Sequence, residues 1–152
     1  MRSALLLAAV LGTLLLQPVL AHASDCPEGV ARPLPVKAPI EYRFGHRLHP
    51  VIGMALFQPN MVFRSLSGQV VRAVRGGRVE PVETTRIGRF VRIGQRDGSA
   101  LRYGPLSQLR VRAGRCVAAG ARLGRTTSSP FTLALRRNEQ WIDPAPLLGG
   151  QR

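Results

Sequence analysis

His46 and His49 are the residues whose type and spacing come nearest to a metal-binding pair in this sequence. Zinc sites usually use at least three side-chain ligands, and only Asp25, Glu28 and Glu41 stand close enough in sequence to supply another. No histidine follows His49. We therefore expect both histidines to be hydrogen-bonded structural or groove-rim residues.

Other hydrolytic chemistries find equally little support. Catalytic serines of hydrolases of one large class stand in a nucleophile-elbow sequence, and no serine here is flanked by one. Catalysis by cysteine would need a reduced thiol, and carboxylate pairs for glycoside cleavage could be drawn only arbitrarily from eight scattered acids. The candidates considered were Ser65, Ser67, Ser107, Cys26, Cys116, Glu80, Glu83, Asp97 and Asp143.

The first 23 residues have the pattern of a secretory signal peptide. Arg2 precedes an apolar run over residues 4–20, which ends in the small-x-small triplet Ala21-His22-Ala23. A membrane anchor is the alternative, but Gln17 and Pro18 interrupt the run and leave it short of a bilayer span. Lipid attachment at Cys26 is disfavoured by the preceding Ser24-Asp25. We expect a periplasmic or otherwise secreted protein with no membrane span in the mature chain.

Cys26 and Cys116 are the two cysteines of a chain predicted to be exported. In an oxidising compartment two such cysteines are expected to pair. The resulting disulfide would tie the N-terminal segment to the turn near Gly114.

The chain is strongly basic, with a formal net charge of +14, and every basic residue except Lys37 is arginine. Arginine side chains suit carboxylate and phosphate groups, so anionic partners are expected. Export argues against nucleic acid as the partner.

The hydrophobic pattern predicts an all-β domain preceded by an extended arm. Residues 24–40 contain Pro27, Pro33, Pro35 and Pro39, a density that excludes a helix. Short β-branched or aliphatic runs follow, and alternations such as Val91-Arg92-Ile93 place aliphatic side chains in a core and arginines toward water or a ligand. The predicted antiparallel strands cover 69–74, 77–82, 90–93, 100–103, 109–112 and 131–136.

A local repeat follows the fourth of these runs. Val111, Val117 and Leu123 recur every six residues with Gly114 and Gly120 between them, which predicts inward aliphatics and tight turns. Biotinyl and lipoyl carrier domains resemble this arrangement. They need a lysine in a turn, and Lys37 in the arm is the only lysine.

Several motifs in order resemble one known family. Residues 44–53 read FGHRLHPVIG, similar to FGxRxHPxxG; residues 68–79 are similar to GTPVxAxxxGxV, and 88–93 to GNxVxI. Residues 103–107 are similar to YxHLS, 111–124 to VxxGxxVxxGxxIG, and Arg136 to Asn138 with Asp143-Pro144 to RxNG and DP. The chain from 44 to 148 thus resembles the lysostaphin/LytM (M23) zinc peptidases. The resemblance implies a compact antiparallel β domain, which we place at 41–152.

The resemblance also implies where catalytic residues would stand. The family holds zinc with a histidine, an aspartate four residues later and the second histidine of an HxH pair. These positions fall on Gln58, Val62 and Thr132, with Pro130 at the first histidine of HxH and Pro105 at the histidine of YxHLS. Neutral amide and hydroxyl oxygens are poor zinc ligands, and valine and proline side chains offer none. We therefore expect a degenerate member with no zinc, no other cofactor and no catalytic residues.

Family members without zinc ligands resemble activators of cell-wall amidases. By that resemblance, Gln58, Val62, Pro105, Pro130 and Thr132 would line a groove for a partner hydrolase or peptidoglycan, with Arg47, Arg64 and Arg136 as candidate rim contacts. The chain lacks the coiled coil or LysM-like repeat of those activators. The alternatives are a groove closed by core filling, an enzyme of unrecognised chemistry, or a residual M23-type endopeptidase using the same cleft.

Overall fold

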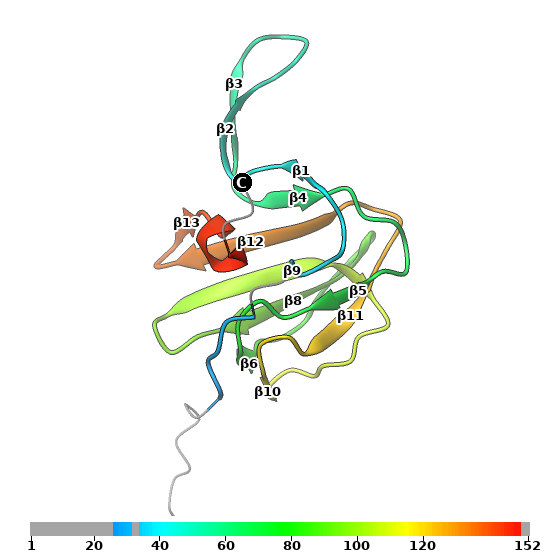
Figure 1. Cartoon of the computed structure of the whole chain (residues 1–152), viewed down its shortest axis with the longest axis vertical. Coiled ribbons are helices and arrows are strands. Elements are labelled where there is room, and N and C mark those ends of the chain that lie inside the picture. Colours follow the sequence, from blue (N-terminus) through cyan, green and yellow to red (C-terminus); the bar gives the residue numbers. More distant parts are fainter. Residues whose placement is uncertain (1–25, 32–33, 150–152) are drawn as a thin grey trace, which may run out of the picture.

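The computed structural model describes residues 26–31 and 34–149, and it is almost entirely antiparallel β structure (Figure 1). The all-β prediction is confirmed. The predicted signal peptide, residues 1–23, lies outside the described residues. In the described part of the chain, no helix is long and apolar enough to cross a bilayer. The elements are β1 Ile40–Tyr42, β2 Gly45–Leu48, β3 Ala55–Gln58, β4 Met61–Phe63, β5 Val70–Arg72, β6 Gly77–Val79, β7 Glu83–Thr85, β8 Gly88–Gly94, β9 Ser99–Ser107, β10 Cys116–Val117, β11 Arg122–Thr126, β12 Phe131–Arg137, β13 Gln140–Ile142 and the 3₁₀ helix η1 Ala145–Leu148.

One large sheet holds most of these strands, in the order β1-β4-β12-β9-β8-β6-β10. Strand β13 extends it beside β12, β7 pairs with β8, and β11 joins β5 to β9. Strands β2 and β3 form a separate hairpin that projects from this body (Figure 1).

The core lies under the inner face of β8, β9 and β12. Val91 and Ile93 of β8 are fully buried while Arg92 between them is exposed, as the alternation predicted. Tyr103 of β9 is also fully buried, and its hydroxyl oxygen accepts the Val74 backbone N–H at 2.9 Å. Burial raises the pKa of this phenol well above its usual range.

One predicted strand is wrong. Residues 109–112 form no strand, because Gln108 turns the chain with a positive φ of 48° directly after β9. The segment then makes an isolated backbone hydrogen bond, from Arg110 N–H to the Leu123 carbonyl at 2.9 Å. Its aliphatic side chains Leu109 and Val111 still pack against the core. The alternation here therefore belongs to an irregular segment that covers the core, and not to a strand of the sheet.

The N-terminal arm packs along the domain and carries the predicted disulfide. Cys26 and Cys116 are bonded, with their Cα atoms 5.1 Å apart, so that prediction is confirmed. The Ala31 N–H donates to the Val74 carbonyl at 2.7 Å, and Val36 is buried with 1% of its surface exposed. Leu34, Val36 and Ala38 of the arm therefore contribute to the core, whereas residues 27–30 lie on the surface.

The turn between β8 and β9 is organised by Asp97. Its carboxylate accepts hydrogen bonds from the Ser99 hydroxyl and from the Ser99 N–H at 2.9 Å, and it pairs with Arg137 at 2.8 Å and Arg75 at 3.7 Å. The Ser99 hydroxyl hydrogen bond makes the largest contribution, and together these contacts lower the pKa of Asp97 to about 2.

We expect this turn to weaken at low pH. A carboxyl whose pKa is lowered on folding adds stability above its ordinary pKa of 3.8, and this stability is lost as the pH falls toward about 2. Asp97→Asn should cost about 1 kcal/mol at neutral pH, since the carboxylate is partly exposed and its ion pairs are screened. Urea unfolding from pH 7 to pH 2 measures both. A parallel pH dependence in the two proteins would contradict the assignment.

Candidate functional site

Two of the five predicted groove positions lie side by side on the outer face of the sheet. Val62 of β4 is paired with Thr132 of β12, and Thr132 is in turn paired with Gly104 of β9. Val62 and Thr132 are partly buried, and the Thr132 hydroxyl donates to the Gly104 carbonyl oxygen at 2.8 Å. The resulting row, Val62–Thr132–Gly104, exposes methyl groups. The proton of its one hydroxyl group is already donated to a backbone carbonyl.

The other three positions are arranged around this row. Pro105 follows Gly104 in β9 and is buried, with a cis peptide bond before it. Pro130 is exposed immediately before β12. Gln58 ends β3, and its side-chain amide donates to the Asn60 side-chain oxygen. The structure thus joins Val62 and Thr132 directly and places Pro105 next along β9, whereas Gln58 belongs to the base of the hairpin.

These residues do not fit a zinc ion. Val62 and both prolines have no side-chain donor atom, and the remaining amide and hydroxyl oxygens are weak zinc ligands. Among the described residues, no group of three or more His, Cys, Asp and Glu side chains could hold a metal. His49 uses its Nδ1 atom to accept the N–H groups of Val51 and Ile52, at 3.2 and 3.4 Å, and the His46 ring lies against Phe57.

The three candidate rim arginines lie at different places. Arg47 of β2 stacks over the Tyr42 ring at 4.3 Å, and Arg64 follows β4 and pairs with Glu41 at 3.7 Å. Arg136 lies on the same face of β12 as Thr132, four residues along, a distance of about 13 Å. Of the three, Arg136 alone lines a hollow on this face of the sheet.

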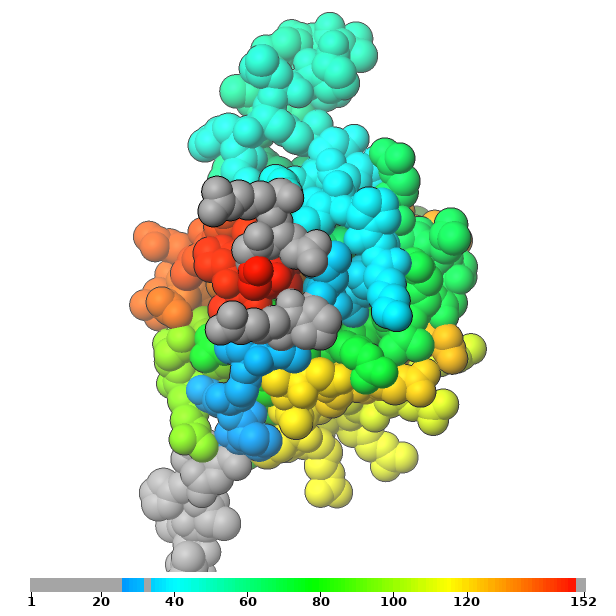
Figure 2. Space-filling view, in the orientation of Figure 1, coloured from blue at the N-terminus to red at the C-terminus, as the bar shows by residue number. Residues whose placement is uncertain are grey.

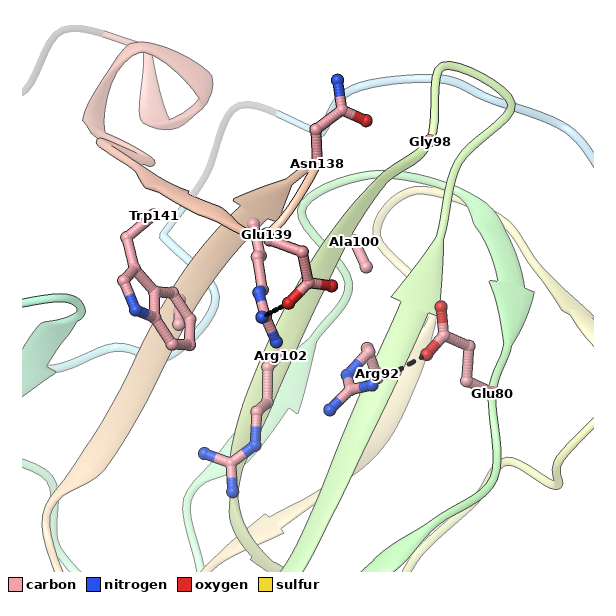
Figure 3. Close-up of a pocket in the computed structure, with 10 residues that line it drawn as sticks. Glu80, Arg92, Gly98, Ala100, Arg102, Asn138, Glu139 and Trp141 are labelled. Atoms are coloured by element: carbon pink, nitrogen blue, oxygen red, sulfur yellow. Dashed lines mark hydrogen bonds and ion pairs between the residues drawn. The ribbon is translucent and has the colours of Figure 1, made fainter.

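A hollow of about 340 Å³ lies over Ala134 and Arg136 of β12, further along that strand from Thr132. Figure 3 shows the residues that line it. Small side chains, Ala100 of β9 and Ala134 of β12, lie among its lining residues, and arginines of three adjacent strands stand around them. Its lining residues are Glu80, Arg92, Gly98, Ala100, Arg102, Ala134, Arg136, Asn138, Glu139 and Trp141.

Two arginines of this hollow lie directly opposite each other on adjacent strands. Arg92 and Arg102 are direct cross-strand partners on β8 and β9, an arrangement in which like charges repel. Each has its own acid: Arg92 pairs with Glu80 at 3.3 Å and Arg102 with Glu83 at 2.9 Å. The carboxylates offset the repulsion and already accept part of the arginine donors, since Arg102 donates to Glu83 through Nε at 3.2 Å and Nη2 at 2.9 Å.

Aromatic rings hold two of these arginines in place. The Arg102 guanidinium lies 3.6 Å from the centre of the Phe90 ring, and Arg136 lies 5.4 Å from that of Trp141 while pairing with Glu139. Trp141 itself is partly exposed. Preorganised guanidinium groups beside an open aromatic ring can bind a carboxylate together with an apolar or sugar moiety.

Sequence reasoning anticipated two residues of this hollow, Arg92 and the candidate rim contact Arg136. The alternation over Val91-Arg92-Ile93 pointed Arg92 toward water or a ligand, but nothing in the sequence joined it to Trp141. That proximity depends on the turn at Asn138 and Glu139, both with positive φ, which folds β13 back along β12. Asn in such a turn was a usable signal, since Asn tolerates this conformation better than most residues.

The sequence profile of peptidase family M23 matches residues 57–144, more than half of the chain. The matched range includes the row Val62–Thr132–Gly104 and most of the sheet. The chain belongs to peptidase family M23. No curated protein matches it closely enough in sequence to count as a relative.

Solved structures share the fold. A protein from Pseudomonas aeruginosa assigned to peptidase M23 superposes with a TM-score of 0.65 at 21% identity, covering 83% of this chain and 54% of its own. A mutant catalytic domain of the prophage-encoded M23 protein EnpA from Enterococcus faecalis gives 0.62 at 25%, covering 71% and 89%. The catalytic domain of lysostaphin from Staphylococcus simulans gives 0.60 at 21%, covering 74% and 93%. The chain therefore spans about half of the Pseudomonas protein and matches the two catalytic domains over most of their length.

Proposed function

We propose that this chain is a catalytically inactive M23-type protein of the cell envelope, which binds carboxylate-bearing peptide on its outer sheet face, along the row Val62–Thr132–Gly104 and in the adjoining arginine hollow. The ligand would be peptidoglycan or an acidic segment of a partner cell-wall hydrolase. The observation that carries the proposal is that Val62 and Thr132, which stand at two of the family's ligand positions, lie side by side and offer zinc no donor atom beyond one hydroxyl, already donated to the Gly104 carbonyl.

The expected location outside the cytoplasm has one structural support. The disulfide between Cys26 and Cys116 belongs to an oxidising compartment, since such bonds are rare in the cytosol. Together with the signal peptide expected at residues 1–23, it favours the periplasm or a secreted form. Cell fractionation with N-terminal sequencing of the exported chain tests this part of the proposal.

Loss of catalysis is tested by metal content and by cleavage. We expect elemental analysis of protein purified without chelator to find no stoichiometric zinc, and peptidoglycan incubated with zinc-supplemented protein to release no fragments, because the groove offers no ligand set. One tightly held zinc per chain, or more released fragments than a Thr132→Val variant gives, would contradict this expectation. Either result would support the alternative that the chain is a residual M23-type endopeptidase.

Binding is tested by substitution in the hollow. Arg92→Gln with Arg102→Gln should weaken binding about tenfold or more, because charge-assisted hydrogen bonds to a carboxylate are among the stronger ones. Arg86→Gln with Arg115→Gln is the matched control, since it removes the same two charges from exposed residues that do not line the hollow. Co-sedimentation with purified sacculi and capture of an identified hydrolase from envelope extract separate the two ligand sources. Equal binding by both variants would contradict the hollow as the site.

A further inference from the structure

The β2–β3 hairpin stands clear of the body of the molecule. Its strands pair only with each other among the described strands, from Gly45 opposite Gln58 to Leu48 opposite Ala55. In the space-filling view it is the cyan projection at one end (Figure 2). A feature held away from the sheet in this way is positioned to reach a surface that the rest of the domain does not touch.

The tip of the hairpin is apolar and open to solvent. Val51 is 83% exposed and Leu48 71% exposed, and the neighbouring Ile52 and Met54 are exposed as well. Residues 48–60 contain no Asp, Glu, Lys or Arg. Contiguous exposed apolar side chains of this kind mark a contact site and not a surface adapted to water.

The backbone of the tip already has hydrogen-bond partners. The His49 N–H donates to the Met54 carbonyl at 2.8 Å, and the Gly53 N–H donates to the His49 carbonyl at 2.9 Å. The His49 ring nitrogen Nδ1 accepts from Val51 and Ile52. These four amide groups can leave water without losing their partners, which lowers the cost of entering an apolar medium.

Below the tip, the side chains at the base of the hairpin are aromatic and basic instead of aliphatic. Phe57 contacts Phe44 edge to face at 5.3 Å, and the partly exposed Tyr42 ring carries Arg47 at 4.3 Å. Arg43 beside them is exposed. No acidic residue occurs from Tyr42 to Val79, so nothing in this stretch of the sequence opposes approach to an anionic surface.

We propose that the β2–β3 hairpin docks on the surface of an anionic phospholipid bilayer. The aliphatic tip enters the interface, the aromatic rings lie at headgroup level, and Arg43 and Arg47 meet the lipid phosphates. The hairpin has an apolar tip above positively charged residues, and a bilayer surface has an apolar interior below anionic headgroups. A protein partner would need a groove that is apolar at its floor and acidic at its rim, in a shape that fits this hairpin. The inference is independent of the proposed function, because the hairpin tip contributes no lining residue to the arginine hollow.

The test uses protein purified after export and vesicles of phosphatidylcholine with or without phosphatidylglycerol. We expect co-sedimentation with the anionic vesicles, weakened by added salt, and little with phosphatidylcholine alone. Val51→Asp with Ile52→Asp should weaken vesicle binding about tenfold or more, because two aliphatic anchors become charged. Arg43→Gln with Arg47→Gln should weaken it while reducing the salt dependence.

Matched controls keep the result specific to the hairpin. Leu66→Asp changes a leucine of similar exposure, 74%, in the loop after β4, and it should bind like the unchanged protein, whereas Leu48→Asp should not. Circular dichroism checks that each variant is folded. Failure of the unchanged protein to bind anionic vesicles, or equal binding by the Leu48 and Leu66 variants, would overturn the proposal, since the second result would assign binding to overall charge.

Discussion

Replacing Cys26 and Cys116 together with serine should lower the free energy of unfolding by about 4 kcal/mol. The bond joins residues 90 positions apart, and cross-linking so long a loop removes much conformational entropy from the unfolded chain. The folded state loses contacts as well, which adds to this destabilisation. A loosened arm would withdraw Val36 from the core, and the hydrogen bond that the Gly76 N–H donates to the Gly29 carbonyl at 3.0 Å would be lost.

Urea unfolding of the oxidised protein, of the reduced protein and of the double serine variant measures the effect. Reduction should destabilise the unchanged protein by a similar amount and leave the variant unaffected, which serves as the control. A loss below about 1 kcal/mol would mean that the arm's packing holds it in place without the bond.

Much of the fold could be predicted because its signals are local. The strands predicted over 90–93 and 100–103 were confirmed in β8 and β9, with the alternation expected over Val91-Arg92-Ile93, and Gly114 and Gly120 take the positive φ expected of tight turns. Val117 and Leu123 of the six-residue repeat are buried, as expected. The same pattern failed over 109–112, where alternation was present but the turn at Gln108 leaves the segment with one backbone hydrogen bond to β11 instead of a ladder.

The site was harder to predict because it depends on register between distant strands. Motif spacing placed Val62 and Thr132 in one groove, and the pairing of β4 with β12 joins them. The hollow was missed because the Arg92–Arg102 pair depends on the register of β8 against β9, which includes a shift between Arg89 and Val91. A bulge of this kind is decided by tertiary packing and leaves little trace in a single sequence. The groove residues themselves remain predictions about binding.

Of the glycine-to-alanine substitutions near the site, Gly104→Ala should be the most damaging. We expect it to lower the free energy of unfolding by about 3 kcal/mol. A Cβ atom at this position would meet Phe90 Cδ1 at 2.5 Å and the Arg89 carbonyl oxygen at 2.9 Å. The φ of 155° is also one that L-residues rarely adopt. The missing side chain of Gly104 therefore provides the space in which the Phe90 ring lies.

Gly94→Ala is the matched control on the adjacent strand β8. Its Cβ would meet only the end of the flexible Glu80 side chain, at 2.9 Å, so we expect a loss below about 1 kcal/mol. Adding Phe90→Ala to Gly104→Ala should make the double variant more stable than the two separate losses predict. The rescue is partial because the Arg89 carbonyl stays in place.

The same substitution connects the fold to the arginine hollow. Arg102 lies over the Phe90 ring at 3.6 Å, so a methyl group that displaces the ring also displaces the guanidinium. We therefore expect Gly104→Ala, at temperatures where it is folded, to weaken sacculus or hydrolase binding. If Gly104→Ala loses stability but binds as well as the unchanged protein, Phe90 does not position Arg102, and the stacking is a packing contact alone.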